Sequence, residues 1–180
     1  TDRAQPPEGF RIGAEFDEAQ INAALQAESR QEQYLLLPTV DTSGHGTAVA
    51  GIAAGYSRGL TETDQPGGTG AYSGVAPEAE LLIVKLGLPD ASSFPRTTEI
   101  MRAVTWALRK AQGLNMPLVI NLSFGNSYGA HDGSSLLERF LDNAAEIGRT
   151  VICVGSGNDG ASAGHLAGSF GQTAQGAVEN

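Results

Sequence analysis

The sequence predicts an α/β fold, a three-layer sandwich in which helices cover both faces of a central parallel sheet. Continuous apolar runs at residues 80–86, 117–122 and 150–154 are typical of strands that are buried on both faces. Segments with apolar residues at helical spacing separate these runs, and the connections between them are short. Strands that alternate with helices in this way pair in parallel, because each helix carries the chain back through a right-handed crossover.

The first half of the chain contributes two predicted helices and the first strand. Residues 17–29 form an amphipathic pattern, and Asp17 is suited to cap the start of this helix. A second helix is expected from His45 to Ala54, and its small apolar residues predict that it is buried against a sheet. A loop rich in Gly, Thr, Ser and Pro, residues 55–74, then precedes the first strand.

The second half continues the alternation between helices and strands. Helical spacing at residues 97–112 predicts a helix, and Gly113 is expected to end it, as glycine often does just past the last turn. Between the second and third strands, Ser134 and Ser135 are expected to cap another helix, which ends at Gly148. Each predicted strand is therefore followed or preceded by a helix that can cover it.

Composition and length fit a single folded domain. The 180 residues suffice for one hydrophobic core, and 41% hydrophobic and 17% charged residues are typical of soluble globular proteins. The net charge of -9 argues against nucleic acid and anionic membrane surfaces as partners. No apolar run approaches the ~20 residues that span a bilayer. The single cysteine, Cys153, is expected to be a small buried hydrophobic residue in the third strand.

Three loops follow the predicted strands at their carboxyl ends. They are the loop after Leu86, residues 123–126 and residues 155–158. Ligands of parallel α/β sheets bind at these ends of the strands. We therefore expect the three loops to lie along one edge of the sheet and to contain the functional site.

His45 stands between two glycines, at the start of a predicted helix of small residues. Glycine on both sides lets a substrate backbone come close to the imidazole. Histidine is also the side chain best suited to take up and release a proton near neutral pH. A histidine that only hydrogen-bonds at a helix start explains the same spacing, so the spacing alone leaves both interpretations open.

Four segments occur in the order that is typical of the subtilases. Residues 44–51 resemble the signature Gly-His-Gly-Thr-x-Val-Ala-Gly of that family, and residues 74–79 resemble its Gly-Val-Ala-Pro-x-Ala segment. Residues 121–125 are similar to its Asn-x-Ser-x-Gly strand end, and residues 154–160 to its Ala-Gly-Asn-x-Gly turn. On these motifs the chain resembles a subtilisin-like serine peptidase.

The resemblance implies a subtilisin-like fold, a protein or peptide substrate and a set of site residues. His45 would be the base of the catalytic triad, and Asn158 would donate a hydrogen bond to the oxyanion. The cleft for the substrate would be lined by two strand-end loops, with Ser123, Phe124, Gly125, Gly155, Ser156 and Gly157.

Neither of the other two triad motifs of the family occurs in these 180 residues. Asp41 lies only four residues before His45, so we expect it to hold the loop that presents the histidine rather than to act in the triad. The triad Asp and Ser are expected outside this chain, which alone should be inactive. We divide this partial catalytic domain into a lead-in helix and loop (1–40), a motif-bearing core (41–160) and a Gly/Ser-rich exit segment (161–180).

Finer details resemble the clostridial Csp-type subtilases, which include spore germination proteases. The matching segments are residues 6–10, 41–45, 93–99 and 126–133. The resemblance implies a secreted or spore-associated protein. Because some Csp-type members keep the fold and lose triad residues, a pseudoprotease that binds or signals without catalysis is the alternative function.

Two other kinds of site have weaker support. Gly155, Gly157 and Gly160 also fit a dinucleotide fingerprint, with Glu179 roughly twenty residues further on. That fingerprint requires an apolar-faced helix directly after the loop, and residues 161–165 do not resemble one. No zinc spacing or Asp-x-Asp loop stands out, so we expect no metal site and no cofactor, although many subtilases bind structural calcium.

Overall fold

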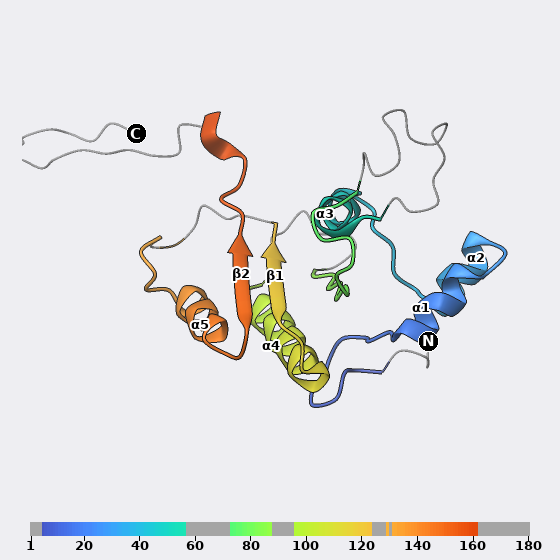
Figure 1. The fold of residues 1–180 in the computed structure, drawn as a ribbon, viewed down its shortest axis with the longest axis horizontal. Coiled ribbons are helices and arrows are strands. Elements are labelled where there is room, and N and C mark those ends of the chain that lie inside the picture. Colours follow the sequence, from blue (N-terminus) through green and yellow to red (C-terminus); the bar gives the residue numbers. More distant parts are fainter. Residues whose placement is uncertain (1–4, 57–72, 88–95, 124–128, 130, 162–180) are drawn as a thin grey trace, which may run out of the picture. The chain divides into compact units, whose positions relative to one another are not determined.

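A computed structural model of the chain describes residues 5–56, 73–87, 96–123, 129 and 131–161. Two compact units divide the chain, Thr1–Arg109 and Lys110–Asn180. Figure 1 shows helices α1, α2 and α3 of the first unit and β1, α5 and β2 of the second. Helix α4 (Thr97–Leu114) begins in the first unit and ends in the second.

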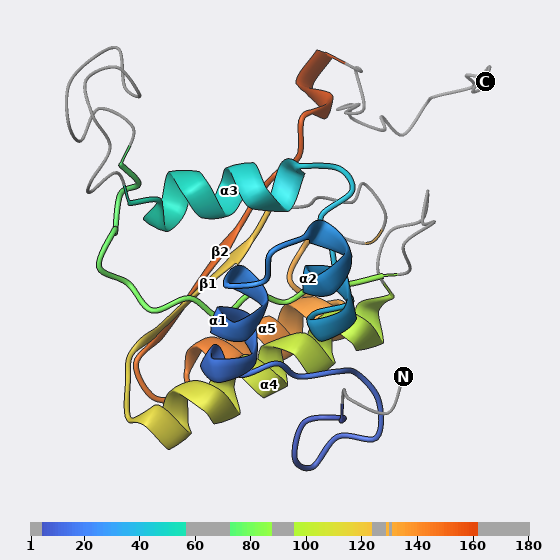
Figure 2. The ribbon, with the colours of Figure 1, turned by 90° about the vertical axis from the view of Figure 1, so that its right-hand side faces the viewer.

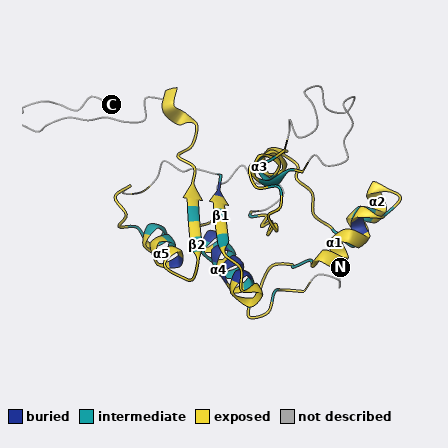
Figure 3. Ribbon diagram, in the orientation of Figure 1, coloured by how far each residue is buried: buried dark blue, intermediate teal, exposed yellow. Residues whose placement is uncertain are grey.

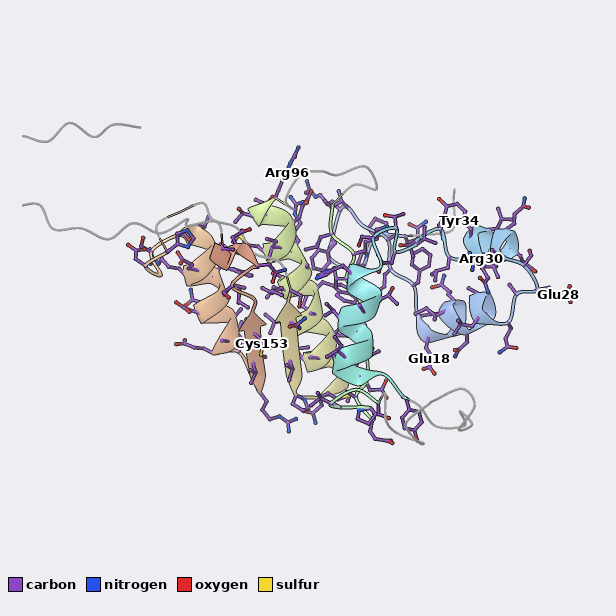
Figure 4. The ribbon with its side chains drawn as sticks, turned by 90° about the horizontal axis from the view of Figure 1, so that it is seen from above. Glu18, Glu28, Arg30, Tyr34, Arg96 and Cys153 are labelled. Atoms are coloured by element: carbon purple, nitrogen blue, oxygen red, sulfur yellow. The ribbon has the colours of Figure 1, made fainter. Side chains whose placement is uncertain are left out.

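The first unit opens with two short helices in place of the single helix predicted at residues 17–29. Helix α1 (Glu18–Leu25) begins with a capping box, in which Asp17 accepts a hydrogen bond from the Gln20 amide at 2.8 Å. Helix α2 (Arg30–Leu36) packs against α1 and begins at a second cap, Ser29. The prediction was wrong because Ser29 starts a new helix instead of ending the first one. Glu18 and Arg30 mark the two helix starts in Figure 4, and Glu28 lies in the link between them.

Helix α4 carries most of the buried residues among those described. Its buried positions recur at helical spacing and form one stripe, seen in dark blue in Figure 3: Ile100, Val104, Ala107, Leu108 and Ala111. The lead-in chain contacts the same helix within the first unit. The Trp106 indole donates a hydrogen bond to the Glu15 carboxylate at 2.9 Å, and the Arg109 guanidinium lies over the Phe10 ring at 5.1 Å.

Helix α4 ends two residues later than predicted. Gly113 remains helical, and the left-handed residue that stops the helix is Asn115, with φ 53°. The Asn115 and Met116 amides donate to the Gln112 and Ala111 carbonyls, which is the hydrogen-bond pattern of a Schellman motif. Asparagine tolerates this conformation better than other residues with a side chain, so it can end a helix in place of glycine.

Two further predictions for the first unit fail. Helix α3 (His45–Ala54) forms where it was expected, but none of its residues is buried, and Ile52 is 71% exposed. Residues 80–86 form neither a strand nor a helix, and the apolar side chains of residues 81–84 are exposed. A strand buried on both faces requires neighbouring strands, and among the described residues no strand pairs with this segment. Small apolar residues allow close packing, but burial also requires another element of the structure to pack against them.

The second unit contains the parallel pair that the sequence predicted. Strands β1 (Leu118–Leu122) and β2 (Thr150–Val154) pair in register from Leu118–Thr150 to Leu122–Val154. Helix α5 (Leu136–Ala145) connects them and packs against β2 (Figure 1). Its start is fixed by a capping box between Ser135 and Glu138, as the serine pair suggested.

One face of the β1–β2 pair is exposed, contrary to the prediction that both faces are buried. Val119 and Val151, which are paired neighbours on this face, are 69% and 56% exposed. Cys153 lies on β2 (Figure 4) and is also exposed, so the prediction of a buried thiol is wrong. The side chains of a strand alternate between its faces, and residue 153 falls on the uncovered one.

Of the helices in the described ranges, none combines the length and the hydropathy that crossing a lipid bilayer demands.

Candidate active site

His45 is the first residue of α3 and is exposed to solvent. Gly44 caps the helix with φ 76°, a left-handed conformation that favours glycine because a β-carbon would clash with the backbone. The His45 amide donates a hydrogen bond to the Ser43 hydroxyl at 3.2 Å. The glycine that precedes the histidine therefore turns the chain sharply into the helix.

The Asp41 carboxylate holds this turn together. One oxygen, Oδ1, accepts hydrogen bonds from the Ser43 amide at 3.1 Å, the Ser43 hydroxyl at 3.2 Å and the Gly44 amide at 2.9 Å. The other, Oδ2, accepts from the Thr47 amide and the Thr47 hydroxyl, both at 2.8 Å. Asp41 thus satisfies the Thr47 amide, which has no partner within the helix, and two amides of the turn before it. This matches the structural role predicted for it.

These hydrogen bonds hold the pKa of Asp41 well below its usual range. The Thr47 amide has the largest effect, followed by the Thr47 hydroxyl and the Gly44 amide. All of these groups donate to the carboxylate, so they stabilise its charged form. A carboxylic acid at this position would lose part of the network that starts α3.

We expect the turn before α3 to weaken in acid. Because the folded-state pKa is depressed, the contribution of Asp41 to stability is present above its ordinary pKa of 3.8 and is lost as the pH falls below that value. Asp41→Asn should therefore destabilise the protein near neutral pH and have a smaller effect in acid. Unfolding of both proteins by denaturant, followed from neutral pH to about pH 3, measures this difference. A difference that stays constant over the whole range would contradict the prediction.

The far end of α3 is held by residues 74–76, which we call the 74–76 strap. The Gly74 amide donates to the Gly55 carbonyl at 2.7 Å, the Val75 amide to the Ile52 carbonyl at 3.0 Å and the Ala76 amide to the Ala53 carbonyl at 2.8 Å. Figure 2 shows this returning chain, in green, at the end of α3 that is opposite to its start. The strap satisfies carbonyl groups that a helix end leaves without partners.

In the second unit, the ends of β1 and β2 bring Ser123 and Gly155 together. The Gly155 amide donates to the Leu122 carbonyl at 3.0 Å, which extends the pairing by one residue beyond the strands. A β-carbon on Gly155 would lie 3.9 Å from the Ser123 Cα. The Ser123 hydroxyl accepts a hydrogen bond from the Asn121 side chain at 2.7 Å. Two of the predicted loops therefore do share one edge of the sheet.

Asn158 follows the turn that leaves this edge. Gly157 has φ 84°, so a residue with a β-carbon would be strained there. Gly155, Ser156, Gly157 and Asn158 are all exposed, and a single 3₁₀ turn (η1, Asp159–Ala161) comes next. Backbone and side-chain donors in such an open turn can approach a ligand that lies across the strand ends.

The predicted site residues fall in both units of the chain. His45 belongs to the first unit, and Ser123, Gly155, Ser156, Gly157 and Asn158 belong to the second. Phe124 and Gly125, together with Glu179, lie outside the described residues. Within the described ranges, no three His, Cys, Asp or Glu side chains gather as ligands for a metal ion.

Two parts of this arrangement were missed from the sequence. The hydroxyl groups of Ser43 and Thr47 join Asp41 to the start of α3, and the pattern Asp-Thr-Ser-Gly is a signal for such side-chain turns. Residues 74–76 stood out in the sequence only as part of a motif that resembles the family's, although they bind the end of α3. No local pattern reveals a contact between segments that are separated by about twenty residues along the chain.

Comparison with known proteins identifies relatives over most of the chain. Over 120 residues it is 35% identical to a subtilisin of Bacillus sp. (strain TA39), and over 161 residues 29% identical to subtilisin E of Bacillus subtilis. The solved structure of the Clostridium perfringens CspB protease matches 82% of the chain with a TM-score of 0.71 and 33% identity. This match confirms the predicted subtilisin-like α/β fold and the resemblance to the Csp-type group.

The match covers only part of each relative. The chain spans 25% and 32% of the lengths of the two subtilisins and 29% of the CspB chain. A family model, described as the subtilase family, matches residues 19–179, which include the His45 motif and the Asn158 turn. The chain therefore belongs to the subtilase family.

Proposed function

We propose that this chain is the part of a serine endopeptidase that supplies the general base and the oxyanion donor. A serine and the triad aspartate would come from polypeptide outside the chain. The substrate would be a protein or peptide, hydrolysed by acyl transfer. The observation that carries this proposal is the order of His45, the β1 strand end and Asn158 in a chain of the subtilase family.

In this mechanism the His45 imidazole accepts the proton of the serine hydroxyl as the serine attacks the peptide carbonyl. The amide group of Asn158 donates a hydrogen bond to the oxyanion that forms. The imidazolium of His45 then gives its proton to the leaving amine, and the same residue activates the water that releases the acyl group. One histidine thus serves both half-reactions.

Several features of the described residues support these roles. His45 is exposed, and among the described residues its imidazole forms no hydrogen bond that would occupy it. The start of α3 is fixed by Asp41, so the imidazole is carried on an ordered turn. Ser123 is half-buried and Gly155 is exposed, so this edge of the strand pair could offer backbone groups to an extended peptide, as strand-like recognition requires.

A serine-directed phosphonate probe tests the proposal. The full-length protein should be labelled at one serine and should hydrolyse peptides, whereas the 180-residue chain alone should show neither labelling nor turnover. Labelling or turnover by the pure 180-residue chain would contradict the assignment of the nucleophile to another segment. A folded full-length protein that is not labelled would overturn the enzyme proposal and favour a Csp-type pseudoprotease.

A further inference from the structure

The side chains of Asn121 and Ser123 form a hydrogen bond at the end of β1. The Asn121 amide nitrogen, Nδ2, donates to the Ser123 hydroxyl at 2.7 Å. The two residues are separated by one position along an extended backbone, so their side chains lie on the same side of it. The contact is therefore set by the conformation of β1 itself, and it does not depend on how the two units of the chain are placed.

Strand β2 lies beside this pair. The Gly155 amide donates to the Leu122 carbonyl at 3.0 Å, which continues the register one residue past Leu122–Val154. Ser123 therefore stands beside Gly155, which has no side chain that could cover the hydroxyl from β2. Both strands end at this edge (Figure 1), and ligands of parallel sheets bind at such ends. The Ser123 hydroxyl is thus a candidate for contact with a bound substrate.

The hydrogen bond from Asn121 decides what the Ser123 hydroxyl can offer. A serine hydroxyl has one proton to donate and two lone pairs with which to accept. Asn121 occupies one lone pair, so the hydroxyl proton must point away from the Asn121 amide nitrogen, which carries protons of its own. An accepted hydrogen bond also polarises a hydroxyl and makes it a better donor. The pair is therefore suited to donate to an acceptor oxygen that lies away from Asn121.

We propose that Asn121 is a positioning residue that directs the Ser123 hydroxyl toward a carbonyl oxygen of the bound peptide. The inference rests on the proposed function, because it requires a peptide substrate that lies across the strand ends. A peptide offers carbonyl oxygens, which accept hydrogen bonds, and amide groups, which donate them. A hydroxyl whose proton is directed outward matches the carbonyl. Asn121 acts through Ser123 in this role, rather than on the substrate itself.

Three variants separate donation by Asn121 from the space that its side chain fills. Asn121→Asp keeps nearly the same size, but the carboxylate only accepts, so the Ser123 hydroxyl would turn its proton back toward residue 121. Asn121→Ala removes the partner, and Ser123→Ala removes the hydroxyl. Cys153→Ala is the matched control, because Cys153 is the register partner of Asn121 on β2 and its replacement leaves the Asn121–Ser123 pair intact.

Two phosphonate probes of the full-length protein measure the effect. A short alkyl fluorophosphonate reacts with the serine but has no peptide carbonyl, whereas a peptidyl phosphonate has several. The ratio of the peptidyl rate to the short-probe rate reports on peptide contacts, because a loss of folded protein or of triad geometry slows both probes alike. Asn121→Asp and Ser123→Ala should lower this ratio by about 3-fold to 10-fold, the scale of one hydrogen bond, and Asn121→Ala by less. Cys153→Ala should keep the wild-type ratio.

The double variant Asn121→Asp/Ser123→Ala shows whether Asn121 acts through Ser123. Its ratio should equal that of Ser123→Ala alone, because residue 121 then has no hydroxyl to direct. The proposal is overturned by an unchanged ratio in Asn121→Asp, by equal slowing of both probes, or by a double variant in which the two single losses multiply. Failure of the proposed function is a different result, since the short probe would then not label the wild type at all, and the basis for this proposal would be lost with it.

Discussion

Replacing His45 with alanine in the full-length protein is expected to lower kcat by about 10⁶-fold, a scale set by measurements on the triad histidine of a subtilisin rather than by this chain. The reason is that the serine hydroxyl is a weak nucleophile until a base removes its proton. KM should change little, because the imidazole interacts with the proton in transit more than with the bound peptide. Steady-state kinetics on a peptide substrate give both constants.

His131→Asn is the matched control for this experiment. His131 is also an exposed histidine, and its φ of 54° is one that asparagine tolerates, so the replacement should not strain the turn. Its kcat should equal that of the wild type. Activity in His45→Ala that stays within about tenfold of the wild type would contradict the role of His45 as the base.

Local signals in the sequence located most elements of the fold. The parallel pair of β1 and β2 and the start of α3 were predicted, as was the cap of α5 at Ser135. These features depend on apolar periodicity, glycine and capping residues, which act within a few residues of one another. The match to a solved Csp-type structure then confirmed the fold class.

The errors concern what lies around an element rather than the element itself. The apolar run 80–86, the small residues of α3 and Cys153 were all expected to be buried. Residues 81–84 of the run and Cys153 are exposed, and no residue of α3 is buried. Apolar composition shows that burial would be favourable, but burial also requires another part of the molecule to cover the surface. The division of residues 17–29 into two helices has a local cause, the second cap at Ser29.

The candidate site was predictable in part because its residues occupy ordered motifs. His45 and Asn158 follow from motif order, and the structural role of Asp41 follows from its distance along the chain from His45. Two sets of contacts could be found only in the structure, because they join atoms that local sequence patterns do not relate. They are the hydrogen bonds of the Ser43 and Thr47 hydroxyls to Asp41 and those of the 74–76 strap to the end of α3.

The second large effect is expected at Asn158. Asn158→Ala in the full-length protein should lower kcat by about 10²-fold to 10³-fold with KM nearly unchanged, a magnitude known from the corresponding replacement in a subtilisin and not calculated for this chain. The side-chain amide has little to bind in the ground state, whereas a negative oxygen develops in the transition state. An interaction made mainly in the transition state affects kcat and leaves KM almost untouched.

Asn158→Asp separates hydrogen-bond donation from shape. The carboxylate has nearly the same size as the amide but cannot donate, and its charge repels the oxyanion, so the loss in kcat should be at least as large as for alanine. Asn143→Ala is the control, because Asn143 is exposed on α5 and lies outside the two strand-end loops. Steady-state kinetics of the three variants give the kcat values that test whether the side chain of residue 158 donates to the oxyanion. If Asn158→Asp kept the wild-type kcat, no donor would be acting at residue 158, and the oxyanion would have to be stabilised by backbone amides alone.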